Sequence, residues 1–115
     1  MSGGWLITRH DTGSPGGIRS VITFADGGVF SGLDLKPTAP PYLGSWEARE
    51  NRRFVAVFWT PLTDDQGASI GTARIRAIGR VDDDKISGTY TATLFVQGQE
   101  QRVSGRFHGD RIDAD

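Results

Sequence analysis

The feature that most constrains this sequence is a pair of expected two-residue turns, since each turn determines which residues face each other across a hairpin. We expect these turns at Asp83-Asp84 and Gly98-Gln99. The first pairs Val81 with Ile86, Ala77 with Tyr90, Ile75 with Ala92 and Ala73 with Leu94, and the second pairs Leu94 with Val103, Ala92 with Gly105 and Tyr90 with Phe107. Both turns put apolar residues on the same side, so three consecutive strands are predicted to share one buried face.

The opposite face of these strands is largely polar and suits contact with water. It comprises Arg74, Arg76, Ile78, Arg80, Ser87, Thr89, Thr91, Thr93, Arg102, Ser104 and Arg106. The arginines resemble a stripe that follows a nucleic-acid backbone, but no exposed aromatic residues for base stacking alternate with them. The formal net charge of the chain is also only -1. We therefore interpret this face as solvated and expect no nucleic-acid partner.

The rest of the chain consists of short alternating runs separated by turn residues, with 16 glycines and five prolines, and no window has a helical period. Eight strands are predicted, at residues 5–10, 18–25, 29–34, 43–49, 53–60, 69–82, 85–97 and 100–112. A chain of 115 residues suits one domain. The prediction is an all-β protein with little or no helix, an eight-stranded antiparallel up-and-down β-barrel over residues 1–115, with a two-sheet sandwich as the alternative.

The two ends of such a barrel are expected to differ. Tight turns at Asp26-Gly27, near Asn51 and at Asp83-Asp84 fall at one end. The long connections fall at the other end, at residues 11–17, 35–42 and 61–68. One end is therefore predicted to be closed and the other to form a mouth, where loops on a rigid scaffold commonly carry binding function.

Gly3-Gly4-Trp5, at the first strand, resembles the G-x-W signature of the lipocalin-like barrels of the calycin group. The resemblance implies that a basic residue of the last strand, Arg106 or Arg111, packs on Trp5. Gly44-Ser45-Trp46 repeats the pattern. The chain is shorter than a typical lipocalin and lacks its flanking helix, so the likeness is to short intracellular bacterial barrels.

A second resemblance is to barrels of the allene-oxide-cyclase type, whose bacterial relatives include cyclases of natural-product pathways. Residues 64–72, Asp-Asp-Gln-Gly-Ala-Ser-Ile-Gly-Thr, are similar to the D-x-x-G-x-x-I-G segment of those proteins, and the segment 84–88 follows after a long strand. Both resemblances imply a lumen that holds a small, largely apolar molecule.

The strand at 53–60 is apolar on both faces, which leaves its orientation open. If Phe54, Ala56 and Phe58 point inward, the expected pairing turns Glu47 inward and leaves Val55, Val57, Trp59 and Trp46 as an outer patch. If the orientation is reversed, Trp46 and Trp59 line the lumen, Phe54 and Phe58 form the patch, and Glu47 is solvated. In both cases we expect the patch to form a homodimer, unless the loop at 35–42 covers it.

Few polar groups are expected in the lumen. Arg9 alternates with Trp5 and Ile7, so if Trp5 plugs the closed end it points inward near the mouth, where it could hold a carboxylate or enolate; the alternative is an arginine at the rim. Tyr90 on the inner face could donate to a carbonyl or remain a core tyrosine. Ser20 is expected to be a small core residue or a second polar feature. Glu47, if it faces an apolar lumen, would act as an acid or base.

The leading hypothesis is a small intracellular barrel that binds an apolar or amphipathic molecule in its lumen. The predicted ligand-binding residues are Arg9, Ser20, Phe24, Trp46, Phe54, Phe58, Trp59, Tyr90, Leu94 and Phe107. The alternative is a cofactor-independent cyclase or isomerase that uses Glu47, Tyr90 or Arg9. A third possibility is a solid barrel that binds a protein partner through its aromatic patch.

The remaining predictions concern metals and location. The chain has no cysteine, and His10, Asp11, His108 and Asp110 lack a characteristic spacing for metal ligation, so neither metal nor cofactor is expected. The segment 1–5 shows no basic region followed by an apolar run, and no stretch is long enough to span a bilayer. We therefore expect a cytoplasmic protein with no membrane partner.

Overall fold

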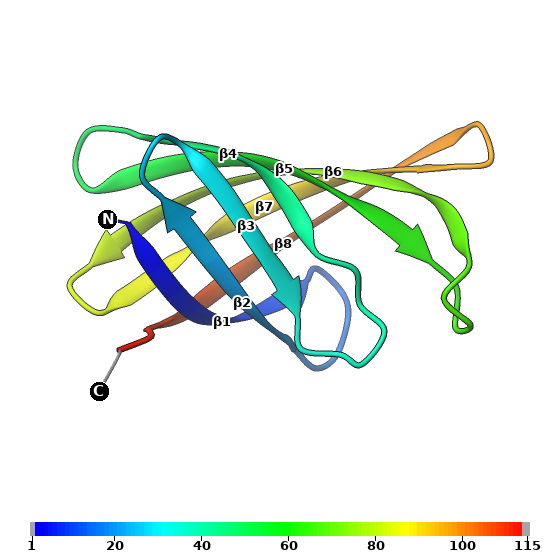
Figure 1. Ribbon diagram of the computed structural model, residues 1–115, viewed down its shortest axis with the longest axis horizontal. Coiled ribbons are helices and arrows are strands. Elements are labelled where there is room, and N and C mark those ends of the chain that lie inside the picture. The colour runs from blue at the N-terminus through cyan, green and yellow to red at the C-terminus, as the bar shows by residue number, and fades with distance from the viewer. Residues whose placement is uncertain (1, 114–115) are drawn as a thin grey trace.

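The alternating segments form strands that pair antiparallel with their sequence neighbours, and β8 pairs with β1, which closes the sheet into a barrel (Figure 1). The computed structural model describes residues 2–113. The strands are β1 (Gly3–Asp11), β2 (Ile18–Ala25), β3 (Val29–Asp34), β4 (Tyr42–Ala48), β5 (Arg53–Thr63), β6 (Ser69–Asp82), β7 (Lys85–Val96) and β8 (Gln99–Arg111). The predicted eight-stranded up-and-down barrel is confirmed and the sandwich alternative is wrong, because closure through β1 and β8 leaves a single sheet. Residues 2–113 contain no helix long and apolar enough to cross a membrane.

The β6–β7 hairpin has the predicted register, with Ala77 opposite Tyr90 and Val81 opposite Ile86. The β7–β8 register differs from the prediction by two residues, so that Tyr90 lies opposite Gly105. The physical reason is the position of the turn, since Gln97 and Gly98 both have positive φ, 52° and 76°. A two-residue turn with both central residues in this region matches the twist of a hairpin. A shift of two residues preserves the side to which each residue points, so the predicted inner face is retained.

The β4–β5 hairpin differs from the prediction in a way that does change faces. Three residues, Glu50 to Arg52, separate the hydrogen-bonded pair Arg49 and Arg53, whose N···O distance is 2.7 Å, and Asn51 and Arg52 both have a φ of 61°. A two-residue turn was expected here. The extra residue moves the register by one position and reverses which β4 residues share a face with those of β5.

The inner face of β5 holds Phe54, Ala56 and Phe58, and Trp46 of β4 lies opposite Ala56 on that same face. Neither predicted arrangement is therefore correct, because each placed Trp46 and Phe54 on opposite sides. Trp59 and Glu47 both point outward. The predicted polar outer face of β6 to β8 is exposed as expected, and only Thr93 is partly covered.

Large inward side chains alternate with inward glycines on neighbouring strands. Phe54 lies opposite Gly79, and a Cβ atom at Gly79 would come within 2.5 Å of the Phe54 ring. Phe107 lies opposite Gly88 in the same way. The glycines let the rings lie flat against the barrel wall, which fits a dense aromatic core inside a small barrel.

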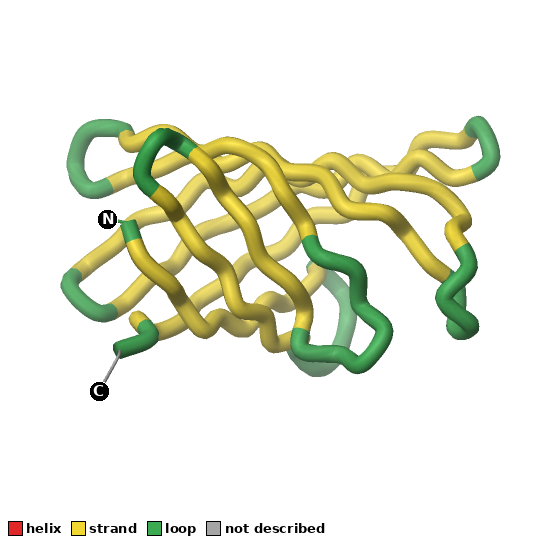
Figure 2. Tube along the Cα trace, viewed as in Figure 1, coloured by secondary structure: helices red, strands yellow, loops and turns green. Residues whose placement is uncertain are grey.

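Strand lengths make the barrel asymmetric, as the trace shows (Figure 2). β6 has 14 residues and β3 has six. The hairpin that joins β7 to β8 and the one that joins β5 to β6 extend past the shorter strands at the end that carries the long loops (Figure 1). The predicted closed end contains the fully buried Trp5, with the guanidinium of Arg111 4.3 Å from the centre of its ring. Arg106, the other residue considered for this contact, is exposed on the outer face.

Candidate functional site

A cavity of about 600 Å³ occupies the lumen at the looped end of the barrel and opens between the loops at 35–41 and 64–68. Its lining is mostly apolar, as is usual for small-molecule sites, and its volume lies in their range. The rings that line it are Phe24, Phe30, Tyr42, Phe54, Phe58, Tyr90 and Phe107. Small inward residues, Ala56, Ala73, Ala77 and Ala92, leave the space between them. The lumen is therefore packed at the Trp5 end and hollow at the looped end.

A cluster of aromatic side chains forms the floor of this cavity. Phe24 lies at its centre, with ring centroids 5.1 Å from Phe30, 5.5 Å from Trp46 and 4.9 Å from Phe54, all in edge-to-face geometry. The cluster extends from Phe30 to Phe58, whose ring centroids lie 4.6 Å apart. Such contacts hold rings in defined positions and add stability beyond area burial. The floor is thus a rigid apolar surface.

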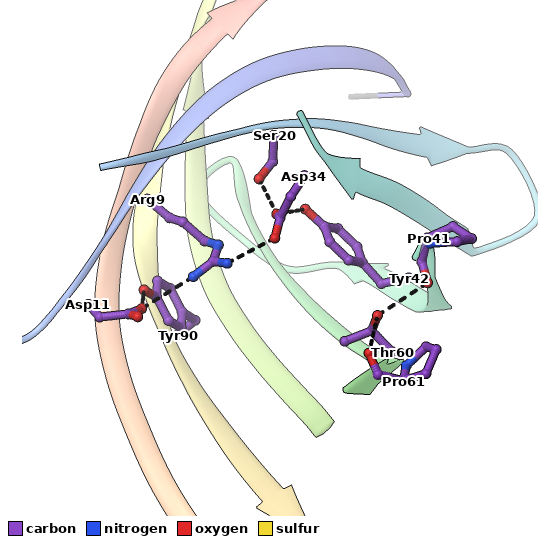
Figure 3. A network of polar contacts seen from close by, with 9 residues as sticks. All are labelled: Arg9, Asp11, Ser20, Asp34, Pro41, Tyr42, Thr60, Pro61 and Tyr90. Atoms are coloured by element: carbon purple, nitrogen blue, oxygen red, sulfur yellow. Dashed lines mark hydrogen bonds and ion pairs between the residues drawn. The ribbon is translucent and has the colours of Figure 1, made fainter. Parts of the chain in front are cut away.

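One wall of the cavity, which we call the polar wall, is formed by Arg9, Asp11, Asp34, Tyr42 and Tyr90 (Figure 3). Arg9 on β1 donates from Nη2 to Oδ2 of Asp34 at 3.0 Å and from Nη1 to Oδ1 of Asp11 at 3.3 Å. These side chains are only 17 to 30 % exposed. Although burial disfavours the charged form, the Asp34 carboxylate raises the pKa of Arg9 above its ordinary value. The guanidinium is therefore charged and shared between two carboxylates.

Asp34, the last residue of β3, is the acceptor for three neighbours. Its Oδ1 accepts from Ser20 Oγ at 2.6 Å and from the Tyr42 hydroxyl at 3.1 Å, and Arg9 donates to its Oδ2. Burial opposes ionisation of this carboxyl, but the Ser20 hydrogen bond and the Arg9 charge outweigh it and lower the pKa of Asp34. Burial and the Asp34 charge raise the pKa of Tyr42. Asp34 is thus ionised and accepts a hydrogen bond from the protonated Tyr42 hydroxyl.

Tyr90 completes the wall on the β7 side. Its hydroxyl donates to Oδ1 of Asp11, which stands on β1 two residues after Arg9. Burial, together with this hydrogen bond, raises the pKa of Tyr90 to about 12. Tyr90 therefore stays protonated at neutral pH.

Most of the residues predicted to bind a ligand surround the cavity. Those that line it are Arg9, Phe24, Phe54, Phe58, Tyr90, Leu94 and Phe107. Ser20 is fully buried behind the lining, where it bonds to Asp34. Trp46 is half-buried against Phe24, and its Nε1 donates to the carbonyl of Ala25 at 2.8 Å. The lumen placement of Trp59 is wrong, because Phe54, Ala56 and Phe58 occupy the inner face of β5 and alternation turns Trp59 outward, where it is 48 % exposed.

Glu47 is also not in the lumen. It points outward, and Oε1 accepts from Arg49 Nη1 at 2.7 Å. Both side chains are more than half exposed. With Phe54 inward, a two-residue turn would have placed Glu47 in the lumen. The extra residue of the β4–β5 turn reverses the faces of the β4 side chains relative to those of β5 and turns Glu47 outward.

Three residues of the polar wall were not among the predicted site residues: Asp11, Asp34 and Tyr42. The sequence signal for Asp11 is simple alternation, because Trp5, Ile7, Arg9 and Asp11 occupy every second position of one strand. Asp34 follows Phe30 and Gly32 in the same manner. Tyr42 could not be found this way, since it precedes the strand predicted at 43–49.

The two histidines lie close together outside the lumen, with ring centroids 5.7 Å apart in a stacked arrangement. His10 Nδ1 also lies 3.1 Å from the carbonyl of Gly16. Within residues 2–113, no group of three or more His, Asp or Glu side chains is arranged to hold a metal ion.

No protein-family model, curated protein or solved structure matches this chain. Its class is therefore defined by its geometry. It is a closed, eight-stranded antiparallel β-barrel with an aromatic cluster inside and a cavity at the looped end.

Proposed function

We propose that this barrel binds a small apolar or amphipathic molecule in its lumen. The observation that carries the proposal is the cavity of about 600 Å³, which has an aromatic floor, one polar wall and an opening between two loops. A lumen evolved only for stability would be expected to be filled to the density of a protein core. A cavity with a few placed polar groups is the general form of a small-molecule site.

A cyclase or isomerase reaction in the same lumen is the second candidate, but the polar wall supports it less well. A general acid or base works best when its pKa lies near the working pH. The pKa of Asp34 is lowered and that of Tyr90 is raised to about 12, so both shifts move away from neutrality. Glu47, the expected base, faces solvent. These groups are better suited to hold and orient a ligand than to exchange protons with it.

We also propose a relationship to the lipocalin-like barrels. It is supported by Trp5 of the Gly3-Gly4-Trp5 motif, which is buried at the closed end under Arg111 of the last strand. The segment similar to allene-oxide-cyclase barrels has a local role in folding. Asp64 Oδ1 accepts from the backbone N–H groups of Gln66 and Ala68, at 2.9 and 3.0 Å, and so shapes the turn before β6.

Filling the cavity tests lumen binding. We expect Ala92→Trp to weaken binding of the neutral dye Nile red by at least about tenfold, since Ala92 lines the cavity and a large ring there would occupy the ligand's space. Thr91→Trp is the matched control, because Thr91 lies next to it on β7 but faces solvent. Dye fluorescence titrations measure both affinities, and circular dichroism confirms that each variant is folded. Equal binding by the two variants would contradict lumen binding.

We further propose that the barrel forms a homodimer through its outer face. Trp59 and Phe95 stack there with centroids 6.0 Å apart, and Leu43 lies opposite Trp59 on the neighbouring strand. The loop at 35–41 lines the cavity mouth and leaves Leu43 and Trp59 exposed. Contiguous exposed apolar residues commonly mark contact sites. Native mass spectrometry is expected to show a dimer that Trp59→Lys converts to a monomer; a monomeric wild-type protein would overturn this proposal.

A further inference from the structure

We propose that the lumen ligand is a hydrophobic amine, that is, an apolar body with a cationic, hydrogen-bond-donating nitrogen that faces the Asp11–Arg9–Asp34 wall. This inference rests on the proposed binding function and adds the charge of the ligand. It is carried by the balance of charges around the cavity and by the hydrogen-bonding groups that remain free on the polar wall.

The formal charge of the cavity lining is negative. Two cationic side chains, Arg9 and Lys36, stand against four anionic ones, and the difference is -2. The anionic set is Asp11, Asp34, Asp64 and Asp65. The first two lie inside the polar wall and the other two at the mouth, on the loop at 64–68. A ligand therefore meets excess negative charge both at the entrance and within, which attracts a cation.

The hydrogen bonds of the polar wall leave acceptor capacity free on its carboxylates, beside the remaining N–H groups of Arg9, which already face Asp11 and Asp34. The hydroxyl groups of Ser20 and Tyr42 donate hydrogen bonds to Asp34, and the Tyr90 hydroxyl donates a hydrogen bond to Asp11. Within residues 2–113, no side chain or backbone N–H donates to Oδ2 of Asp11. Each carboxylate oxygen can accept about two hydrogen bonds. A ligand that donates hydrogen bonds can use the free acceptor capacity of these carboxylates, whereas a ligand that only accepts hydrogen bonds cannot.

The ion pairs of Arg9 disfavour a carboxylate or enolate as its ligand, which the sequence had left open. Both terminal nitrogens of its guanidinium already bind carboxylates, at 3.0 and 3.3 Å. A ligand carboxylate that approached Arg9 would come close to Asp11 and Asp34 as well. Repulsion between like charges in a partly buried site is costly. Arg9 is better described as the group that holds two carboxylates together in an apolar lumen.

The aromatic side chains beside the wall add a second attraction for a cation. The Tyr42 hydroxyl bonds to Asp34 while its ring lies 5.1 Å from that of Phe58. Both rings line the cavity. An ammonium group that contacts a carboxylate here also lies near ring faces, which attract cations. The apolar part of the ligand would then rest on the floor formed around Phe24.

Three probes with the same alkyl chain and different head groups test the inference: decylamine, decanol and decanoate. Isothermal titration calorimetry at neutral pH and low salt is expected to give decylamine on the order of tenfold tighter binding than decanol, with decanoate weakest. Asp11→Asn should reduce the affinity for decylamine severalfold and leave that for decanol nearly unchanged. Asp110→Asn is the control, since it removes the same charge from an exposed position on the outer face and should change neither affinity.

The outcomes separate this inference from the function on which it rests. Decanol or decanoate binding as tightly as decylamine to the wild-type protein would overturn the amine assignment and leave lumen binding intact. If none of the three probes and no Nile red binds, both proposals fail. Because the head-group comparison uses the wild-type protein, it remains decisive even if Asp11→Asn does not fold.

Discussion

Replacing Trp5 by alanine is expected to lower the free energy of unfolding by about 4 kcal/mol, the range found for large aromatic residues removed from a core. Trp5 is fully buried at the closed end of the barrel. Its ring is covered by Arg111, and the strand that carries it pairs on both sides, with β2 and β8. The cavity left by truncation could not collapse easily, because closed strand pairing fixes the surrounding backbone. Urea denaturation followed by circular dichroism measures the change.

Two further variants separate the contribution of the Trp5 ring volume to stability from that of its contact with Arg111. Trp5→Phe is expected to cost about 1 to 2 kcal/mol, since it keeps most of the apolar volume and removes an indole N–H that has no hydrogen-bond partner within residues 2–113. Arg111→Ala should cost about 1 kcal/mol through loss of the cation–π contact. Arg106→Ala on the outer face of the same strand should cost less. A loss below about 1 kcal/mol for Trp5→Ala would show that Trp5 is not the plug of the barrel.

The fold was predictable from the sequence because the evidence for it is local and repeated. Alternating apolar residues and turn residues specify strand and connection at each step, and the β6–β7 turn fixes an inner face on its own. The misplaced turn at Gly98 shows why this prediction was robust. A tight turn displaced by one position moves the register by two, and every side chain keeps its face.

The candidate site was less predictable, for a physical reason that one turn illustrates. The segment from Arg49 to Arg53 admits loops of two or three residues, and only Asn51 and Arg52 at positive φ distinguish them. No glycine marks that conformation, so the sequence carries no signal for the longer loop. The consequence is that both predicted arrangements placed Trp46 and Phe54 on opposite sides, and that Glu47 was expected in the lumen whenever Phe54 pointed inward.

The carboxylates of the polar wall, Asp11 and Asp34, were missed although Arg9 and Tyr90 were predicted, because the wall depends on contacts between distant segments. Alternation alone could have placed Arg9 and Asp11 on the same inner face. That Asp34 reaches Arg9 follows only from the pairing of β1 with β2 and of β2 with β3, which brings Ser20 opposite both Ile7 and Asp34. A sequence in which the first loop lacks a clear turn motif does not define that register.

Asp34→Ala is expected to destabilise the barrel by about 3 kcal/mol at neutral pH, because it removes the shared acceptor of Arg9, Ser20 and Tyr42 and leaves their donors partly buried. Glu47→Ala provides the control. It also removes a carboxylate paired with an arginine, but both partners are exposed. Its effect should stay within about 0.5 kcal/mol. Equal effects of the two substitutions in urea denaturation would contradict a structural role for the polar wall.

The pH dependence of the Asp34 effect has a definite sign. The hydrogen bond from Ser20 and the charge of Arg9 outweigh burial and lower the pKa of Asp34 in the folded state. In the unfolded chain the pKa of an aspartate is about 3.9. The stability due to ionised Asp34 is therefore fully present above that value and is lost as the pH falls through the lower folded pKa. The gap between the wild-type protein and Asp34→Ala should be constant from neutral pH to about pH 5 and should narrow below about pH 4. If the difference in the free energy of unfolding does not narrow, packing and neutral hydrogen bonds, rather than the carboxylate charge, hold the polar wall together. That outcome would also remove the electrostatic basis for preferring a cationic ligand.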